Sequence, residues 1–263
     1  MGQFDPYSRH ELRKIRRAWL WRRRWLIAAG MALMVAMALA MEVWYRFAGV
    51  SGPVRWYVSG AFHVGAVAAI LHFLMLAFLA QDPAAIRHLR GAWGEEATRE
   101  ELKRARWRRS IWGWVDSVPL QYGDIDHLVV TRHGGLVAID SKWSNEADAD
   151  RRRAMAAAAS RVKQRSEAVV RTVLKSERGD HRAHGSHVTV QPVVVVWGAL
   201  QNEVPEGARL DGVEFVAGRE LVRWLKALDG EPVDRAAGRD LIERLVTFRE
   251  STSSAIAARA ERV

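Results

Sequence analysis

Two short clusters of polar residues combine carboxylates with a basic side chain at strand-like spacing. The first is Asp124-Ile125-Asp126-His127, and the second is Asp140-Ser141-Lys142. The chain between them is apolar except around His133-Gly134-Gly135, a sequence typical of a tight turn. Two strands joined by this turn would place Asp126 opposite or diagonal to Asp140. The pattern therefore predicts that carboxylates and an amine converge at the open end of a hairpin.

Such a cluster favours phosphodiester chemistry. Alternation along a strand places Asp140 and Lys142 on one face and Ser141 on the other. Adjacent carboxylates repel each other unless a cation neutralises them, and Mg²⁺ or Mn²⁺ prefers oxygen ligands. The Lys142 ammonium would then stabilise charge on a phosphate or lower the pKa of an attacking water. The alternative is an ordinary hairpin with solvated aspartates at its strand ends and a surface lysine.

The elements that would position this cluster follow from hydrophobic periodicity and turn signals. We predict a helix over 93–106, strands over 111–121, 124–131 and 136–143, a long helix over 145–177, a strand over 188–197, a short strand over 213–216, and helices over 219–227 and 233–260. This order is typical of an α/β domain with a mixed sheet flanked by helices.

The N-terminal part of the chain has the composition of a membrane anchor. Two apolar runs, Trp25–Met41 and Trp56–Ala80, are separated by a short connector with Gly49, Gly52 and Pro53. Their lengths suit a transmembrane helical hairpin. The expected divisions are a basic segment over 1–24, the hairpin over 25–80, a catalytic-type domain over 91–216 and C-terminal helices over 217–263.

Basic residues predict the orientation of this hairpin. The first 24 residues carry eight Arg and Lys against Asp5 and Glu11, whereas the connector has only Arg46 and Arg55. The positive-inside rule then places both termini and the following domain in the cytoplasm, as a multi-pass protein of a bacterial-type inner membrane. A cleaved signal peptide is the competing interpretation, against which stands the second apolar run.

Several motifs in order resemble a known family. Gly91-Ala92-Trp93-Gly94-Glu95, then Ile125-Asp126-His127, then Gly135-Leu136-Val137-Ala138-Ile139-Asp140-Ser141-Lys142, are similar to the nuclease-related domain (NERD) of the PD-(D/E)XK restriction-endonuclease-like superfamily. The resemblance covers roughly residues 91–216. It implies a restriction-endonuclease-like mixed sheet and a metal-dependent nuclease site.

The resemblance also implies roles for individual residues. Asp126 would be the main metal ligand, with Asp140 and Glu95 as further ligands and Lys142 as a catalytic group. Glu95 opens a helix in the family motif, and Gln164 on the following helix is the candidate that completes the catalytic set. The family usually has Glu where this chain has Asp140, whose shorter side chain would place the metal differently.

Further basic and histidine residues are secondary candidates. The cationic stretch that includes Arg151, Arg152, Arg161 and Arg165 would track a nucleic-acid backbone, although a solvated helix face explains it equally well. His127 is expected beside Asp126 as a supporting group. His181, His184 and His187 are expected in a solvated loop, with a transition-metal site as the alternative. The absence of cysteine excludes disulfides and Cys-ligated zinc.

Two functions from different classes follow. The first is a membrane-anchored, Mg²⁺-dependent nuclease that acts on DNA, with RNA as the alternative substrate. The second is a noncatalytic, membrane-tethered module that keeps the nuclease fold for binding nucleic acid or protein. The net charge of +10 fits an anionic partner, either DNA or lipid headgroups. Homo-oligomerisation is compatible with both functions, and no particular protein partner is indicated.

Overall fold

A computed structural model describes residues 7–49, 51–120, 123–146, 148–175, 189–230 and 232–260. The histidines at 181, 184 and 187 lie outside these ranges. The chain divides into two compact units: residues 10–89 form one, and residues 90–263 together with residues 7–9 belong to the other.

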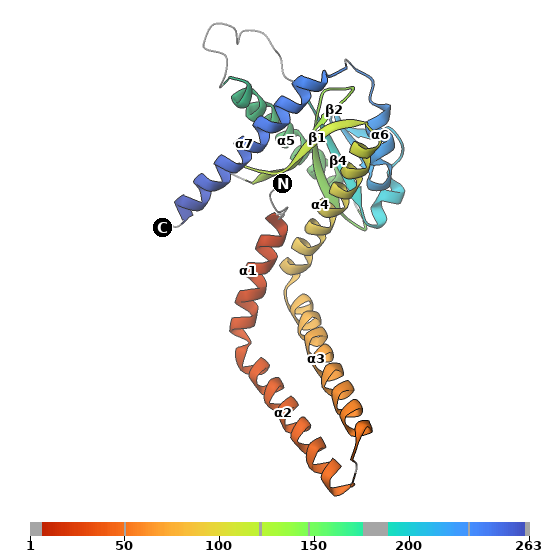
Figure 1. Ribbon diagram of the computed structural model, residues 1–263. Coiled ribbons are helices and arrows are strands. Elements are labelled where there is room, and N and C mark those ends of the chain that lie inside the picture. Colours follow the sequence, from red (N-terminus) through yellow and green to blue (C-terminus); the bar gives the residue numbers. More distant parts are fainter. Residues whose placement is uncertain are drawn as a thin grey trace. The chain divides into compact units, whose positions relative to one another are not determined.

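The N-terminal unit is helical (Figure 1). It contains α1 (Tyr7–Arg22), α2 (Arg24–Phe47) and α3 (Pro53–Gln81). By length and composition alone, α2 and α3 are able to cross a membrane, each with a mean hydropathy of 2.2 over its most apolar stretch. Almost none of either stretch is buried within the protein, unlike a core helix, although a signal sequence near an N-terminus has the same composition.

The connection between α2 and α3 is a tight one. Gly49 and Gly52 have φ angles of 64° and 83°, in the left-handed region that glycine adopts without a steric penalty. Pro53 then begins α3, at a position where its missing N–H costs no hydrogen bond. An ion pair between Glu42 and Arg55 links the two helices across this turn. The two apolar helices are therefore arranged as a hairpin.

The second unit is built on a six-stranded mixed sheet with strand order β1-β2-β3-β4-β6-β5. The strands are β1 (Ile111–Pro119), β2 (Asp124–Thr131), β3 (Leu136–Trp143), β4 (Val190–Trp197), β5 (Arg209–Leu210) and β6 (Val213–Ala217). The pairs β1/β2, β2/β3 and β5/β6 are antiparallel, whereas β3/β4 and β4/β6 are parallel. The helix α5 (Ala149–Lys175) makes the crossover from β3 to β4, as a parallel pair requires.

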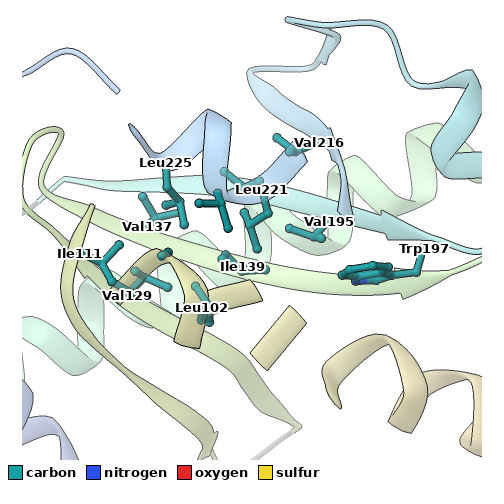
Figure 2. Packing of buried hydrophobic residues seen from close by; sticks show 13 residues of the cluster. Leu102, Ile111, Val129, Val137, Ile139, Val195, Trp197, Val216, Leu221 and Leu225 are labelled. Atoms are coloured by element: carbon teal, nitrogen blue, oxygen red, sulfur yellow. The ribbon is translucent and has the colours of Figure 1, made fainter. Parts of the chain in front are cut away.

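Helices cover both faces of this sheet (Figure 1). On one face lie α4 (Pro83–Trp107) and α6 (Leu221–Ala227), which enclose a core that includes Leu102, Val129, Ile139, Trp197 and Leu221 (Figure 2). On the other face lie α5 and α7 (Arg235–Ala260), which pack on the alternate residues of the same strands. The predicted α/β architecture with a mixed sheet is confirmed.

The element boundaries follow the sequence prediction with a few differences. The strands at 124–131 and 136–143 are confirmed to the residue. α4 begins ten residues before the predicted start, because Pro83 suits the first turn of a helix and the Asp82 carboxylate accepts hydrogen bonds from the amides of Ala84 and Ala85. The helix α1, the two-residue β5 and the 3₁₀ helices η1 (Ala199–Glu203) and η2 (Gly218–Glu220) were not predicted.

Candidate functional site

The hairpin of β2 and β3 brings the two polar clusters together at one end of the sheet. Their register pairs His127 with Ile139, so Asp126 and Asp140 are the next residues on the two strands. The Asp126 carboxylate accepts a hydrogen bond of 2.8 Å from the Ser141 amide. Asp126 is therefore fixed against the end of β3 by the backbone of the neighbouring strand.

Side chains at the end of β3 alternate between the two faces of the sheet. The Lys142 ammonium donates a hydrogen bond of 2.5 Å to Oδ1 of Asp140, which places both residues on one face. Ser141 points to the other face, where its hydroxyl donates to Oγ1 of Thr98 on α4. The Asp140 side chain is 6% exposed and that of Lys142 is 36% exposed. The lysine is thus the more accessible member of the pair.

The carboxylates of this cluster destabilise one another's charged forms. Burial, together with repulsion from Asp140, raises the pKa of Asp126 to about 7. Burial also raises the pKa of Asp124, and the charge of Asp140 adds to this effect. For Lys142, burial lowers the pKa, but the attraction of Asp140 and Asp126 outweighs it and the net shift is upward. The lysine is a fixed positive charge among repelling carboxylates.

Glu95 approaches the same strand end from α4. Its side chain is buried, and its charge is near enough to Lys142 to raise the pKa of that lysine. The preceding residue, Gly94, packs directly on β3: a Cβ at this position would lie 3.6 Å from the Trp143 amide nitrogen. The helix backbone therefore passes in contact with the end of β3, which holds Glu95 at the cluster. Glu95, Asp126, Asp140 and Lys142 are brought to one region of the sheet.

Asp124 belongs to the same electrostatic group, although the sequence analysis gave it no role. Its pKa responds to the charges of Lys142, Asp140 and His127. It stands two residues before Asp126 on β2, and this spacing places both carboxylates on the same face of a strand. The Asp-x-Asp spacing is the signal in the sequence that could have identified Asp124 as a member of the cluster.

The α5 candidates are distributed unevenly around the helix. Gln164 is exposed, and no interaction joins it to the carboxylates within the described part of the chain. Arg151 and Arg161 are also exposed on α5, and Arg152 lies 3.7 Å from Glu203. Arg165 differs: its guanidinium lies 3.5 Å from where a Cβ on Gly123 would stand, beside the start of β2. Of these residues, Arg165 is the one placed next to the cluster.

His127 belongs to a buried network on the opposite face from Asp126. Its Nδ1 lies 2.7 Å from Oδ1 of Asp116, which also accepts a hydrogen bond from the Trp114 indole. Arg99 on α4 donates to the other carboxylate oxygen of Asp116. Burial acts to raise the pKa of Asp116, but these partners outweigh it and hold that pKa below its usual value. His127 therefore packs on the face of β2 opposite to Asp126 and does not contact the Asp126 carboxylate.

The donor chemistry of the cluster suits a divalent cation, but the side chains are not arranged around a preformed metal position. Within the described ranges, no group of three or more carboxylate or imidazole side chains has that arrangement. Lys142 occupies one oxygen of Asp140, while the other, Oδ2, is buried and has no hydrogen-bond partner among the residues that the structure describes. A buried carboxylate oxygen without a partner is costly, and a cation would satisfy it. Asp140 and Asp126 are the residues best suited to hold one.

Comparison with known proteins gives one match. Residues 90–197 match the sequence model of a family described as a nuclease-related domain, NERD. Neither the curated proteins nor the solved structures gave a significant match. The matched range begins in α4, ends with β4 and contains every residue of the cluster described above.

Proposed function

Because residues 90–197 form a nuclease-related domain, we propose that the chain is a membrane-anchored, divalent-metal-dependent nuclease that hydrolyses phosphodiester bonds in DNA. The observation that carries this proposal is the convergence of Asp126, Asp140 and Lys142 at the open end of the β2/β3 hairpin. Buried carboxylates of like charge are unfavourable for folding alone. A cation bound by the carboxylates, and a phosphate group that contacts Lys142, would account for the presence of these carboxylates beside a lysine.

Each residue of the cluster has a proposed role that follows from its position. Asp126 and Asp140 would hold Mg²⁺ or Mn²⁺, and Glu95 approaches the same strand end from its other side. The bound cation would supply Lewis-acid activation of a water and of the phosphate. Lys142 remains protonated among the carboxylates and is partly exposed, so it is placed to stabilise negative charge on the phosphate. Arg165, beside Gly123, is positioned to bind a neighbouring phosphate.

A cleavage assay on the purified full chain in detergent micelles tests the proposal. The wild type is expected to cut DNA when Mg²⁺ or Mn²⁺ is added and to be inactive in EDTA. Asp126→Asn should lower both metal affinity and cleavage, whereas Lys142→Met should lose at least about 100-fold in cleavage rate and keep most of its metal affinity. Isothermal titration with Mn²⁺ measures the affinity.

Matched controls are available on the exposed surface of the same unit. Asp229 and Lys226 are exposed and make no ion pair within the described residues, so Asp229→Asn and Lys226→Met repeat the same chemical changes away from the cluster. Both variants should cleave DNA at the wild-type rate. A wild type that binds neither cation and cuts neither DNA nor RNA would overturn the catalytic proposal.

One observation favours a second candidate, the noncatalytic tethered module. The Lys142–Asp140 ion pair partly neutralises the cluster without any metal, so the fold has an alternative to cation binding. In that case the domain would still bind nucleic acid but would not respond to divalent ions. The Mn²⁺ titration separates the two candidates.

A further inference from the structure

A concave surface in this unit lies at the free edge of the sheet. It is a groove of about 830 Å³, formed by β1, the C-terminal part of α4 and the helix α7. β1 pairs with β2 on one side only, so its other edge carries backbone groups without a neighbouring strand. Ligand sites typically have volumes in the range of this groove. We define this surface as the edge groove.

The edge groove is strongly basic. Seven arginines and three acidic residues line it, and it contains no lysine. Arg99 is paired with Asp116, and Arg249 lies 3.5 Å from Glu250. The remaining five arginines form no ion pair with any residue that the structure describes: Arg106, Arg109, Arg132, Arg235 and Arg239. Guanidinium groups without a carboxylate partner are suited to bind phosphates in a bidentate manner.

Tryptophans are interleaved with these arginines. Trp107, at the end of α4, is 82% exposed, the most exposed aromatic side chain among the described residues of this unit. Trp112 lies under the guanidinium of Arg132, at 4.1 Å from the ring centroid. The Nε atom of Arg132 is buried and has no hydrogen-bond partner in the described part of the chain. An exposed indole beside unpaired guanidinium groups is the combination that binds single-stranded nucleic acid through stacking and phosphate contacts.

The edge groove leads toward the carboxylate cluster. Its lining on β1 runs from Ile111 to Asp116, and β1 continues to Pro119, which pairs with Asp124. At about 3.3 Å per residue, the distance from Asp116 to Pro119 is about 10 Å. Arg99, which also lines the groove, lies one helical turn after Glu95 on α4. A linear polyanion in the groove would therefore extend to the end of the sheet where the cluster lies.

We propose that the edge groove binds a single strand of nucleic acid, with phosphates on its unpaired arginines and a base stacked on Trp107. The groove then delivers single-stranded segments to the carboxylate cluster. This delivery step rests on the proposed function, whereas the binding of a strand in the groove does not depend on it. An anionic lipid surface is the competing occupant. The concave shape favours a strand, because a bilayer is flat on this scale and would not reach the partly buried Arg132.

The binding test uses the full chain in nanodiscs of neutral lipid, with EDTA to prevent cleavage. The probe is a fluorescein-labelled 12-nucleotide oligo(dT), followed by anisotropy over a range of salt concentrations. The double variant Arg235→Gln/Arg239→Gln is expected to bind about 10-fold more weakly, and to lower the slope of log affinity against log salt by about 1.4. Trp107→Ala should weaken binding by about 5-fold or more, with an unchanged slope.

The matched control is Arg219→Gln/Arg223→Gln, which removes the same charge from the η2 and α6 region outside the edge groove. It should bind oligo(dT) like the wild type, and a 12-base-pair duplex should bind the wild type about 10-fold more weakly than the single strand. Groove variants that bind like this control would overturn the proposal, and so would a wild type that binds a duplex and a single strand equally.

The lipid alternative has its own outcome. A loss of binding to phosphatidylglycerol vesicles, with oligo(dT) binding intact, would assign the groove to the membrane and overturn the proposal. The proposed function has a separate outcome. If oligo(dT) binds in the groove but the protein never cleaves it, the proposed nuclease activity is wrong and the edge groove remains a strand-binding site.

Discussion

Asp140 and Asp126 differ in how the protein satisfies them. Asp140 shares its Oδ1 with the Lys142 ammonium and has a buried Oδ2 without a partner, whereas Asp126 accepts a hydrogen bond from the Ser141 amide. Neither arrangement removes the repulsion between the two carboxylates, and burial together with this repulsion raises the pKa of Asp126 to about 7. Without a cation, the folded state favours the protonated form of Asp126.

This shift predicts a pH-dependent stability. Because the pKa of Asp126 rises from 3.8 to about 7 on folding, its ionisation destabilises the metal-free fold progressively as pH rises between these values. Asp126→Asn, which keeps a hydrogen-bond acceptor for the Ser141 amide, should therefore be stabilising in EDTA. The advantage over the wild type should grow by about 2 kcal/mol between pH 5.5 and pH 8, measured from thermal unfolding in micelles.

The control for this prediction is Asp229→Asn, which makes the same chemical change on an exposed side chain away from the cluster. Addition of Mg²⁺ at pH 8 should raise the melting temperature of the wild type but not that of Asp126→Asn. An advantage that is constant from pH 5.5 to pH 8 would show that repulsion within the cluster does not limit stability.

At the scale of secondary structure, the hairpin was predictable and its surroundings were less so. The strand limits of β2 and β3 follow from alternating apolar residues bounded by polar clusters and glycines, which are local signals. The same alternation predicted that Asp140 and Lys142 share a face. The position of Gln164 depends on the rotation of α5 against the sheet, and its exposure does not support the catalytic role that the resemblance implied.

The edge groove shows the other limit of sequence reasoning. Its arginines come from α4, the following loop, the end of β2 and α7, so residues more than 100 positions apart share one surface. No short-range pattern predicts such a set, because it depends on α7 packing against β1.

Two helix glycines give a test of how closely the helices pack. A Cβ on Gly94 of α4 would make ordinary contacts at 3.6 Å or more, whereas a Cβ on Gly238 of α7 would lie 2.6 Å from the Trp112 ring. Gly94→Ala should therefore stabilise the protein by up to about 1 kcal/mol through helix propensity. Gly238→Ala should destabilise it by about 1–3 kcal/mol, because ring and helix must separate.

Thermal unfolding of the two variants in the same micelles provides the comparison, since each serves as the control for the other. Equal shifts of the melting temperature in the two variants would contradict the close approach of α7 to β1.

At the scale of the whole molecule, the absence of cysteine makes the proposed membrane topology easy to test. Single cysteines introduced at Ser51, between α2 and α3, and at Ser253, in α7, should label differently with a membrane-impermeant maleimide. In intact cells, Ser51→Cys should be labelled and Ser253→Cys protected until the membrane is permeabilised, because the positive-inside rule predicts that both termini lie in the cytoplasm. Labelling of Ser253→Cys in intact cells would reject the hairpin topology.

The packing of α7 on β1 has a consequence for how the domain folds. The Trp112 indole donates a hydrogen bond to the Val233 carbonyl, 121 positions away, and Leu245 of α7 is fully buried in the core beneath the sheet. Contacts over such separations form late, because a long loop must first be closed. Until they form, β1 is an uncovered edge strand rich in tryptophan, a template for pairing with other chains. Concentration-dependent aggregation during refolding is therefore the expected failure of any fragment that ends with the matched domain at residue 197.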